Sequence, residues 1–246
     1  MRIRIFPTSD SVARTLAADV AAAVRANPSL VLALPTGQTP IALYRHLTAL
    51  HRDGTVDFSR VATFNLDEFE GIGPADPRSY RTFLQRHLFG QVNLSPRRIH
   101  CLNGSADDLD AECERYERAI ARAGGIDLLI LGLGVNGHVG FNEPGASLMA
   151  RTHRATLAAA TRHANRGLFG SRAADVPRTA ISIGIGTILA ARRVVLMATG
   201  AAKARPVERM VNGPVTPWLP ASFLQLHDAV DVWLDRTAAR RLRRLR

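Results

Sequence analysis

The segment GLGVNGHVGFNEPG, residues 132–145, places side chains capable of acid–base chemistry among glycines, directly after the apolar run 126–131. His138 and Glu143 lie five positions apart and could form a pair in which the carboxylate orients the imidazole and stabilises its charged form. The glycines permit positive φ angles and a close approach to packing partners or a ligand. The segment is therefore either a tight strand-to-helix turn or a ligand site at the carboxyl end of a parallel strand.

A second stretch, LPTGQTP at residues 34–40, follows an apolar strand and could bind an anion. Thr39 is a residue type preferred at a helix N-cap, and Pro40 is favoured at the first helical position. Backbone N–H groups and hydroxyls at such a helix start can hold an anion, here those of Thr36, Gly37, Gln38 and Thr39. The stretch matches neither G-x-G-x-x-G nor a Walker loop, so no nucleotide is predicted. Taken alone, it is better explained as an ordinary strand-to-helix turn.

Adjacent acids, Asp67 and Glu68, end a further predicted strand in ATFNLDEFEG. Such a pair is commonly a solvated turn, and no His/Cys/Asp set of suitable spacing accompanies it, so we predict no metal site. A lone carboxylate in a partly dry pocket could instead act as a proton-transferring base. The chain has no G-x-S-x-G element for a serine nucleophile. Acid–base chemistry without a covalent serine is therefore the preferred interpretation, and no cofactor is expected.

The elements that must position these residues alternate along the chain. Strands are expected at 3–6, 30–34, 61–65, 98–102, 126–133, 179–183, 193–198 and 229–234, and helices at 9–26, 40–52, 78–88, 106–123, 201–212 and 236–245. Continuous apolar strands separated by helices predict parallel pairing with both faces of the sheet covered. The fold class is therefore α/β, a doubly wound, mostly parallel, Rossmann-like sheet in a single domain over residues 1–246. The irregular stretch at 144–177 could include a mobile lid over the strand ends, although its alanines fit ordinary helix equally well.

Composition restricts the classes of function. The 246 residues are 46% hydrophobic and 22% charged, which is typical of a globular protein. The formal net charge of +11 could suggest nucleic acid, but the last ten residues carry five arginines, and aromatic residues make up only 6% of the chain. A basic balance also suits an anionic small substrate. No apolar run is long enough for a membrane span or a secretory signal, and the two cysteines form no disulfide framework. We expect a cytoplasmic protein that binds neither nucleic acid nor membrane.

The stretches taken together resemble the glucosamine-6-phosphate deaminases, a group related to the 6-phosphogluconolactonases. The resemblance rests on LPTGQTP, FNLDEFEG with PRSY, GLGVNGHVGFNEPG and GPVTPWLPASFLQLH, and it covers essentially the whole chain. The F-N-E-P element and the A-S-F-L-Q-L-H ending match the deaminase branch, whereas lactonases usually lack the Asn-Glu-Pro.

The resemblance implies a role for each matching residue. Asp67 matches the base that moves a proton between C2 and C1, and His138 matches the ring-opening acid–base group with Glu143 as its charge partner. Asn136 occupies a position that is Asp or Asn in the family, and as Asn it can orient His138 without adding negative charge. Lys203 matches a lysine that contacts phosphate, and residues 36–39 match the phosphate loop.

Two departures concern the phosphate and regulation. Deaminases usually carry A-N-x-R-F-F, whereas this chain reads ANRGLF at 164–169, with Gly167 at the arginine position. We predict that Arg166, or Arg162 one helical turn earlier, replaces that arginine. The basic pair that allosteric members use reads His153 and Ala155 here, so an allosteric hexamer is not expected, and we predict a monomer or small homo-oligomer.

The resemblance implies an amino-sugar-phosphate isomerase and deaminase of the hydrolase class, acting in N-acetylglucosamine catabolism. Glucosamine 6-phosphate and water would become fructose 6-phosphate and ammonia. The alternatives are a lactonase in which His138 activates water, a deaminase of galactosamine 6-phosphate, and a non-catalytic sugar-phosphate-binding regulator. Retention of Asp67, His138 and Glu143 together argues against the regulator.

Overall fold

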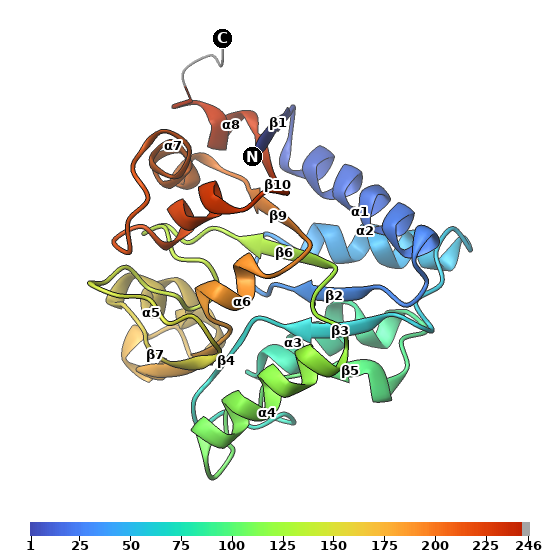
Figure 1. Cartoon of the computed structure of the whole chain (residues 1–246), viewed down its shortest axis with the longest axis horizontal. Coiled ribbons are helices and arrows are strands. Elements are labelled where there is room, and N and C mark those ends of the chain that lie inside the picture. The colour runs from blue at the N-terminus through green and yellow to red at the C-terminus, as the bar shows by residue number, and fades with distance from the viewer. Residues whose placement is uncertain (243–246) are drawn as a thin grey trace.

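The computed structural model describes residues 1–242 and contains a seven-stranded sheet at its centre (Figure 1). The strands lie in the order β1-β10-β9-β6-β2-β3-β5, and every neighbouring pair is parallel. Their bounds are β1 Arg2–Phe6, β2 Val31–Leu34, β3 Ala62–Asn65, β5 Ile99–His100, β6 Leu128–Gly132, β9 Arg193–Ala198 and β10 Val230–Asp235. The predicted doubly wound α/β fold is confirmed.

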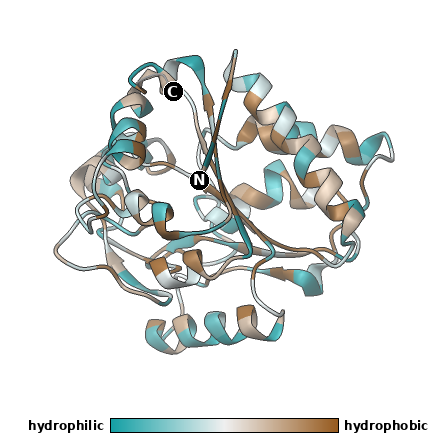
Figure 2. Ribbon diagram, turned by 45° about the horizontal axis from the view of Figure 1, so that its top comes forward, coloured by the Kyte–Doolittle hydropathy of each residue, from teal (hydrophilic) through white to brown (hydrophobic). Residues whose placement is uncertain are grey.

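Helices cover both faces of this sheet, and each face has its own hydrophobic core. One core contains α1 (Ser9–Ala26), α2 (Ile41–Arg52) and α3 (Tyr80–His87). The other contains α4 (Leu109–Arg122), α6 (Ile185–Leu189), α7 (Ala204–Asn212) and α8 (Arg236–Ala239). Because successive strand residues point to opposite faces, Leu32 and Leu34 belong to the first core, and Val31 and Ala33 to the second. Figure 2 shows the resulting apolar strands between helices on either side.

A second sheet of three antiparallel strands corrects the sequence-based prediction. β4 (Asp67–Phe69) and β7 (His153–Thr156) both pair with β8 (Thr179–Ser182). We expected residues 179–183 to form a strand of the parallel sheet, and this was wrong. The strand instead pairs with two short segments that carry polar residues and give no strand signal of their own. The same region contains α5 (Ala159–Asn165), within the stretch 144–177.

Several element boundaries also differ from the prediction. Helix α2 begins at Ile41, with Pro40 in the N-cap position and no side-chain cap, so Thr39 does not cap this helix. The helix expected at 201–212 begins as a 3-10 turn, and α8 ends at Ala239; residues 243–245 of that predicted helix lie outside the described part. The 3-10 segments are η1 Phe89–Gln91, η2 Pro96–Arg98, η3 Arg166–Leu168, η4 Ala173–Asp175, η5 Ala201–Lys203 and η6 Pro220–Leu226. No helix within residues 1–242 has the length and apolar character needed to cross a membrane.

The order of the strands fixes where a ligand can bind. β2 and β6 are neighbours, but the chain continues from β2 towards β3 and β5, and from β6 towards β9 and β10. The connections after these two strands therefore diverge and leave a crevice at their carboxyl ends, which is the usual ligand site of an open α/β sheet. The stretches 34–40 and 132–145 both begin at this point.

Candidate active site

A cavity of about 330 Å³ opens at the carboxyl ends of β2 and β6. Six parts of the chain line it: the loop after β2, the start of β4, the start of α3, the end of β6 with the loop after it, α5, and the turn before α7. Seven of the residues singled out from the sequence lie on its wall: Thr36, Gly37, Gln38, Thr39, Asp67, His138 and Lys203.

Asp67 reaches the cavity from the first position of β4. The residue is only 6% exposed, and burial raises the pKa of its carboxyl group to about 7. Within residues 1–242 no hydrogen-bond donor contacts this carboxylate, and it faces Gly140, where a Cβ atom would lie 3.7 Å from Oδ2. Because desolvation alone disfavours the charged form, the group can accept a proton near neutral pH. This is the property required of a general base.

Glu68 lies next to Asp67 in sequence but serves a different purpose. Neighbouring residues of a strand point to opposite sides, and only Asp67 lines the cavity. The Glu68 carboxylate is buried and accepts the backbone N–H groups of Phe69, Tyr80 and Arg81, the last two at the start of α3. Burial raises the pKa of Glu68 to about 8, although these N–H groups favour the ionised form. The side chain therefore anchors α3 to β4.

His138 lies beside Glu143, as the sequence indicates. Its Nδ1 is 3.5 Å from Oε2 of Glu143 and 3.2 Å from the hydroxyl of Thr161. The ring packs flat against the backbone at Gly134, where a Cβ atom would lie 2.5 Å from the ring carbons, so only glycine fits. With Nδ1 directed at the carboxylate, Nε2 is the nitrogen left for chemistry in the cavity.

Glu143 and Asn136 support the ring from behind and do not themselves line the cavity. Asn136 donates its amide to Glu143 Oε2 at 2.7 Å and accepts the backbone N–H of His138. Burial acts to raise the pKa of Glu143, but hydrogen bonds from His138, Thr161 and Asn136 outweigh it and hold the pKa below its usual value. The carboxylate is therefore ionised at neutral pH and can stabilise an imidazolium.

The opposite end of the cavity can hold an anion. Gly37 adopts a φ of 95°, so the loop after β2 turns through a conformation that favours glycine. Lys203 lines the same cavity, and burial lowers the pKa of its ammonium group. The turn that carries it is fixed at Gly200, whose N–H donates to the carboxylate of Asp235. A bound anion would stabilise the charged form of this lysine and raise its pKa again.

Arg166 lies outside this arrangement. The residue is exposed, its guanidinium donates to the carbonyl of His163, and it does not line the cavity. Gly167 is also exposed, and a Cβ atom at its position would meet nothing within 4 Å. Arg162 does not line the cavity either, and its Nε is buried without a partner among the described residues. That Arg166 or Arg162 replaces the usual phosphate-binding arginine stays a prediction. That the stretch 144–177 includes a mobile lid stays a prediction as well.

Three polar residues of the site were not assigned from the sequence. Thr161 is buried against His138, and Asn165 of the same helix accepts a hydrogen bond from the hydroxyl of Tyr80 at 3.0 Å. All three line the cavity. Tyr80 and Asn165 do occur within the motifs PRSY and ANRGLF, but no spacing relates them to each other across 85 positions.

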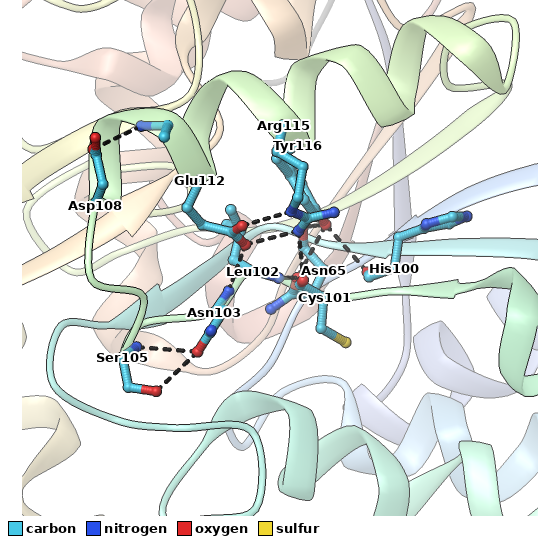
Figure 3. A network of polar contacts seen from close by, with 11 residues as sticks. Asn65, His100, Cys101, Leu102, Asn103, Ser105, Asp108, Glu112, Arg115 and Tyr116 are labelled. Carbon is cyan, nitrogen blue, oxygen red and sulfur yellow. Dashed lines mark hydrogen bonds and ion pairs between the residues drawn. The ribbon is translucent and has the colours of Figure 1, made fainter.

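A buried network of polar contacts surrounds Asn65, and Figure 3 shows the part that includes Leu102, Arg115 and Tyr116. Asn65 donates its amide to the Asp67 carbonyl at 2.7 Å. Its Oδ1 accepts the backbone N–H of Leu102 and the hydroxyl of Tyr116, each at 3.0 Å. The network continues through Arg115, which is paired with Glu112 on α4. It therefore joins β3, β4 and α4 at the point where the chain leaves the main sheet.

The chain belongs to the family described as glucosamine-6-phosphate isomerases/6-phosphogluconolactonase, whose model matches residues 7–233. A glucosamine-6-phosphate deaminase of Halothermothrix orenii is 45% identical over 239 residues, covering 97% of this chain and 99% of the relative. One from Thermoanaerobacter sp. strain X514 is 42% identical over 239 residues, with 97% and 94% coverage.

Solved structures give the same result. A monomeric glucosamine-6-phosphate deaminase superimposes with a TM-score of 0.95 at 40% identity, covering 98% of this chain and all (100%) of that one. A 6-phosphogluconolactonase from Thermotoga maritima gives a TM-score of 0.72 at 20% identity, covering 95% of this chain and 98% of the other. That second likeness shows the shared fold alone.

The network around Asn65 should contribute measurably to stability. Asn65→Ala removes a donor and an acceptor from buried partners, so we expect a loss of about 2–4 kcal/mol in the free energy of unfolding. Tyr116→Phe removes one hydroxyl and should cost about 1–2 kcal/mol. Urea denaturation measures both. If both substitutions left the free energy of unfolding unchanged, the network would not be what stabilises this region.

The burial of Asp67 predicts a pH-dependent stability. Its pKa is raised from 3.8 to about 7 on folding, so the folded protein binds more protons across that window and stability falls as the pH rises through it. Asp67→Asn cannot ionise and should be more stable than the wild type at pH 8, by at most about 4 kcal/mol. Denaturation at pH 8 and at about pH 4 tests this. If the variant and the wild type differed in stability by the same amount at both pH values, the raised pKa of Asp67 would be contradicted.

Proposed function

We propose that the protein converts glucosamine 6-phosphate and water into fructose 6-phosphate and ammonia. The observation that carries the proposal is one cavity in which a desolvated Asp67 carboxylate, an imidazole backed by Glu143 and a half-buried Lys203 converge. The relatives named glucosamine-6-phosphate deaminase, matched over nearly the whole chain, support it.

The first step opens the sugar ring. Nε2 of His138 takes the proton of the C1 hydroxyl and delivers a proton to the ring oxygen O5, so that the C1–O5 bond breaks and C1 becomes an aldehyde. The ring passes through an imidazolium, which the ionised Glu143 stabilises across 3.5 Å. Thr161 and Asn136 keep the imidazole and the carboxylate in place.

The second step moves a proton within the open chain. The Asp67 carboxylate removes the proton from C2 while one proton of the substrate's C2 ammonium group passes to O1, which gives a neutral enolamine, and the resulting carboxylic acid then returns the proton to C1. C2 is then an imine carbon, water adds to it, and ammonia leaves to give the ketone of fructose 6-phosphate. A base with a pKa near 7 suits both directions of this transfer.

The phosphate would bind at the other end of the cavity. The backbone N–H groups and hydroxyls of residues 36–39 precede α2, and Lys203 supplies a full charge. Arg166 is left out of this proposal because its guanidinium donates to His163.

Release of ammonia is the direct test of the proposed function. Wild-type protein should release ammonia from glucosamine 6-phosphate, and galactosamine 6-phosphate run in parallel decides the epimer. Acid release from 6-phosphogluconolactone, with no ammonia from either amino sugar, would favour the lactonase. Binding of the sugar phosphate without turnover of any of these compounds would favour a regulator.

Asp67→Asn should reduce kcat for ammonia release by at least about 10²-fold, with little change in KM, because the amide cannot accept the C2 proton. In the wild type, kcat/KM should rise with pH and reach half of its maximum near pH 7, where Asp67 ionises. Asp107→Asn, an exposed acid outside the cavity, is the matched control and should leave both constants unchanged. Near-normal turnover by Asp67→Asn would remove Asp67 from the mechanism.

Lys203→Ala should raise KM for the sugar phosphate by about 10- to 100-fold, because a charge-assisted hydrogen bond contributes about 1.5–3 kcal/mol. Arg166→Ala removes the same charge from an exposed position and should leave KM unchanged if the guanidinium stays outside the cavity. Steady-state kinetics of the two variants decide between them. A raised KM in Arg166→Ala alone would make Arg166 the main cationic contact.

A further inference from the structure

A second hollow is lined by residues of α2, of α3 and of the turn η1 that follows α3. It has a volume of about 810 Å³, and we call it the α2–α3 groove. Its wall includes Ile41, Arg45, Thr48, Ala49, Arg52, Asp53 and Arg86. None of them lines the catalytic cavity.

The groove is strongly cationic. Three guanidinium groups face a single carboxylate, that of Asp53, which already accepts the backbone N–H of Thr55. Arg52 and Arg86 lie near the ends of their helices, where cations stabilise the helix dipole, and this alone would explain them. Arg45 lies in the middle of α2, however, and its ion pair with Asp10 is exposed on both sides and therefore weak.

A buried hydroxyl within the groove lacks a partner. Thr48 is 7% exposed, and its Oγ1 makes no hydrogen bond to any of the described residues. Buried polar groups are nearly always paired, and one that is not deserves an explanation. Rotation of the Thr48 side chain towards the groove would let a bound ligand accept the hydroxyl proton and supply the missing bond.

We propose that the α2–α3 groove binds a small organic anion, with a phosphate or carboxylate group held by Arg45, Arg86 and the Thr48 hydroxyl. Ile41 and Ala49 give the groove an apolar part of its wall, which suits a ligand with a carbon skeleton rather than a bare inorganic ion. Guanidinium groups carry planar sets of N–H donors that suit the oxygens of a phosphate or carboxylate, and Arg52 already donates to the side chain of Gln91.

The two helices that line the groove both begin beside the active site. Helix α2 begins at Ile41, directly after the loop that lines the catalytic cavity, and Tyr44 of α2 donates to the carbonyl of Pro35. Helix α3 begins at Tyr80, which lines the cavity as well. An anion in the groove would therefore contact two helices that both begin beside the catalytic cavity.

Calorimetric titration of the full chain tests the proposal. The probes are phenyl phosphate and benzoate. Inorganic phosphate is the control ion without a carbon skeleton, and benzyl alcohol is the neutral control. The protein carries Lys203→Ala, which weakens phosphate binding in the catalytic cavity and makes the result independent of the proposed reaction. We expect phenyl phosphate, benzoate or both to bind more tightly than about 1 mM, and more tightly than either control probe.

Variants locate the binding site. Arg86→Ala and Arg45→Ala should each weaken binding at least about tenfold, whereas Arg97→Ala, an exposed arginine outside the groove, should not. Thr48→Val preserves the shape and removes the hydroxyl, so binding should weaken while the unfolding temperature stays equal or rises. Absence of binding by both organic anions, equally tight binding of inorganic phosphate, or affinities that Arg86→Ala and Arg45→Ala leave unchanged would each overturn the proposal.

Discussion

The site depends on a carboxylate that the fold keeps dry. Asp67 is placed on a short antiparallel strand that leaves the main sheet, and no hydrogen-bond donor within residues 1–242 reaches its side chain. The charged form is therefore unfavourable, which raises the pKa of the group to about 7 and makes it a base at neutral pH. The same desolvation destabilises the folded protein, and the surrounding structure has to hold the carboxylate in place. The amide of Asn65 and the anchoring of α3 by Glu68 do so from two sides.

The pKa values of two carboxylates of the site, Asp67 and Glu143, are shifted in opposite directions. Asp67 is isolated from donors, whereas Glu143, almost as deeply buried, receives hydrogen bonds from Asn136 and a backbone N–H and stays ionised. Pairs of titratable groups whose environments separate their pKa values in this way are typical of sites that need an acid and a base together. The neutral amide of Asn136 fits this division, because a second carboxylate there would compete with Glu143 for the proton of His138.

The main sheet and most of the candidate catalytic residues could be predicted from the sequence because they leave local signals. Continuous apolar strands, the glycines around His138 and the loop at Thr36–Thr39 are each contained in a short stretch of chain. The three-stranded sheet could not be predicted, since β4 and β7 are three and four residues long and exist only through pairing with β8. The Tyr80–Asn165 and Thr161–His138 contacts join residues 85 and 23 positions apart, and no periodicity encodes them. Thr39 was assigned as an N-cap from residue type alone, and the actual helix start depends on the turn at Pro40.

In the proposed function, the loop after β2 has two tasks. Residues 36–40 connect β2 to α2, and the N–H groups of residues 36–39 would also bind the phosphate; the positive φ of Gly37 lets the backbone turn before the helix begins. The loop contributes no charge, so the full positive charge among the described wall residues comes from Lys203, on a turn that Asp235 fixes at Gly200. Desolvation lowers the pKa of this lysine, and a phosphate bound beside it would favour the charged ammonium form again. Binding of an anion and protonation of Lys203 would therefore favour each other.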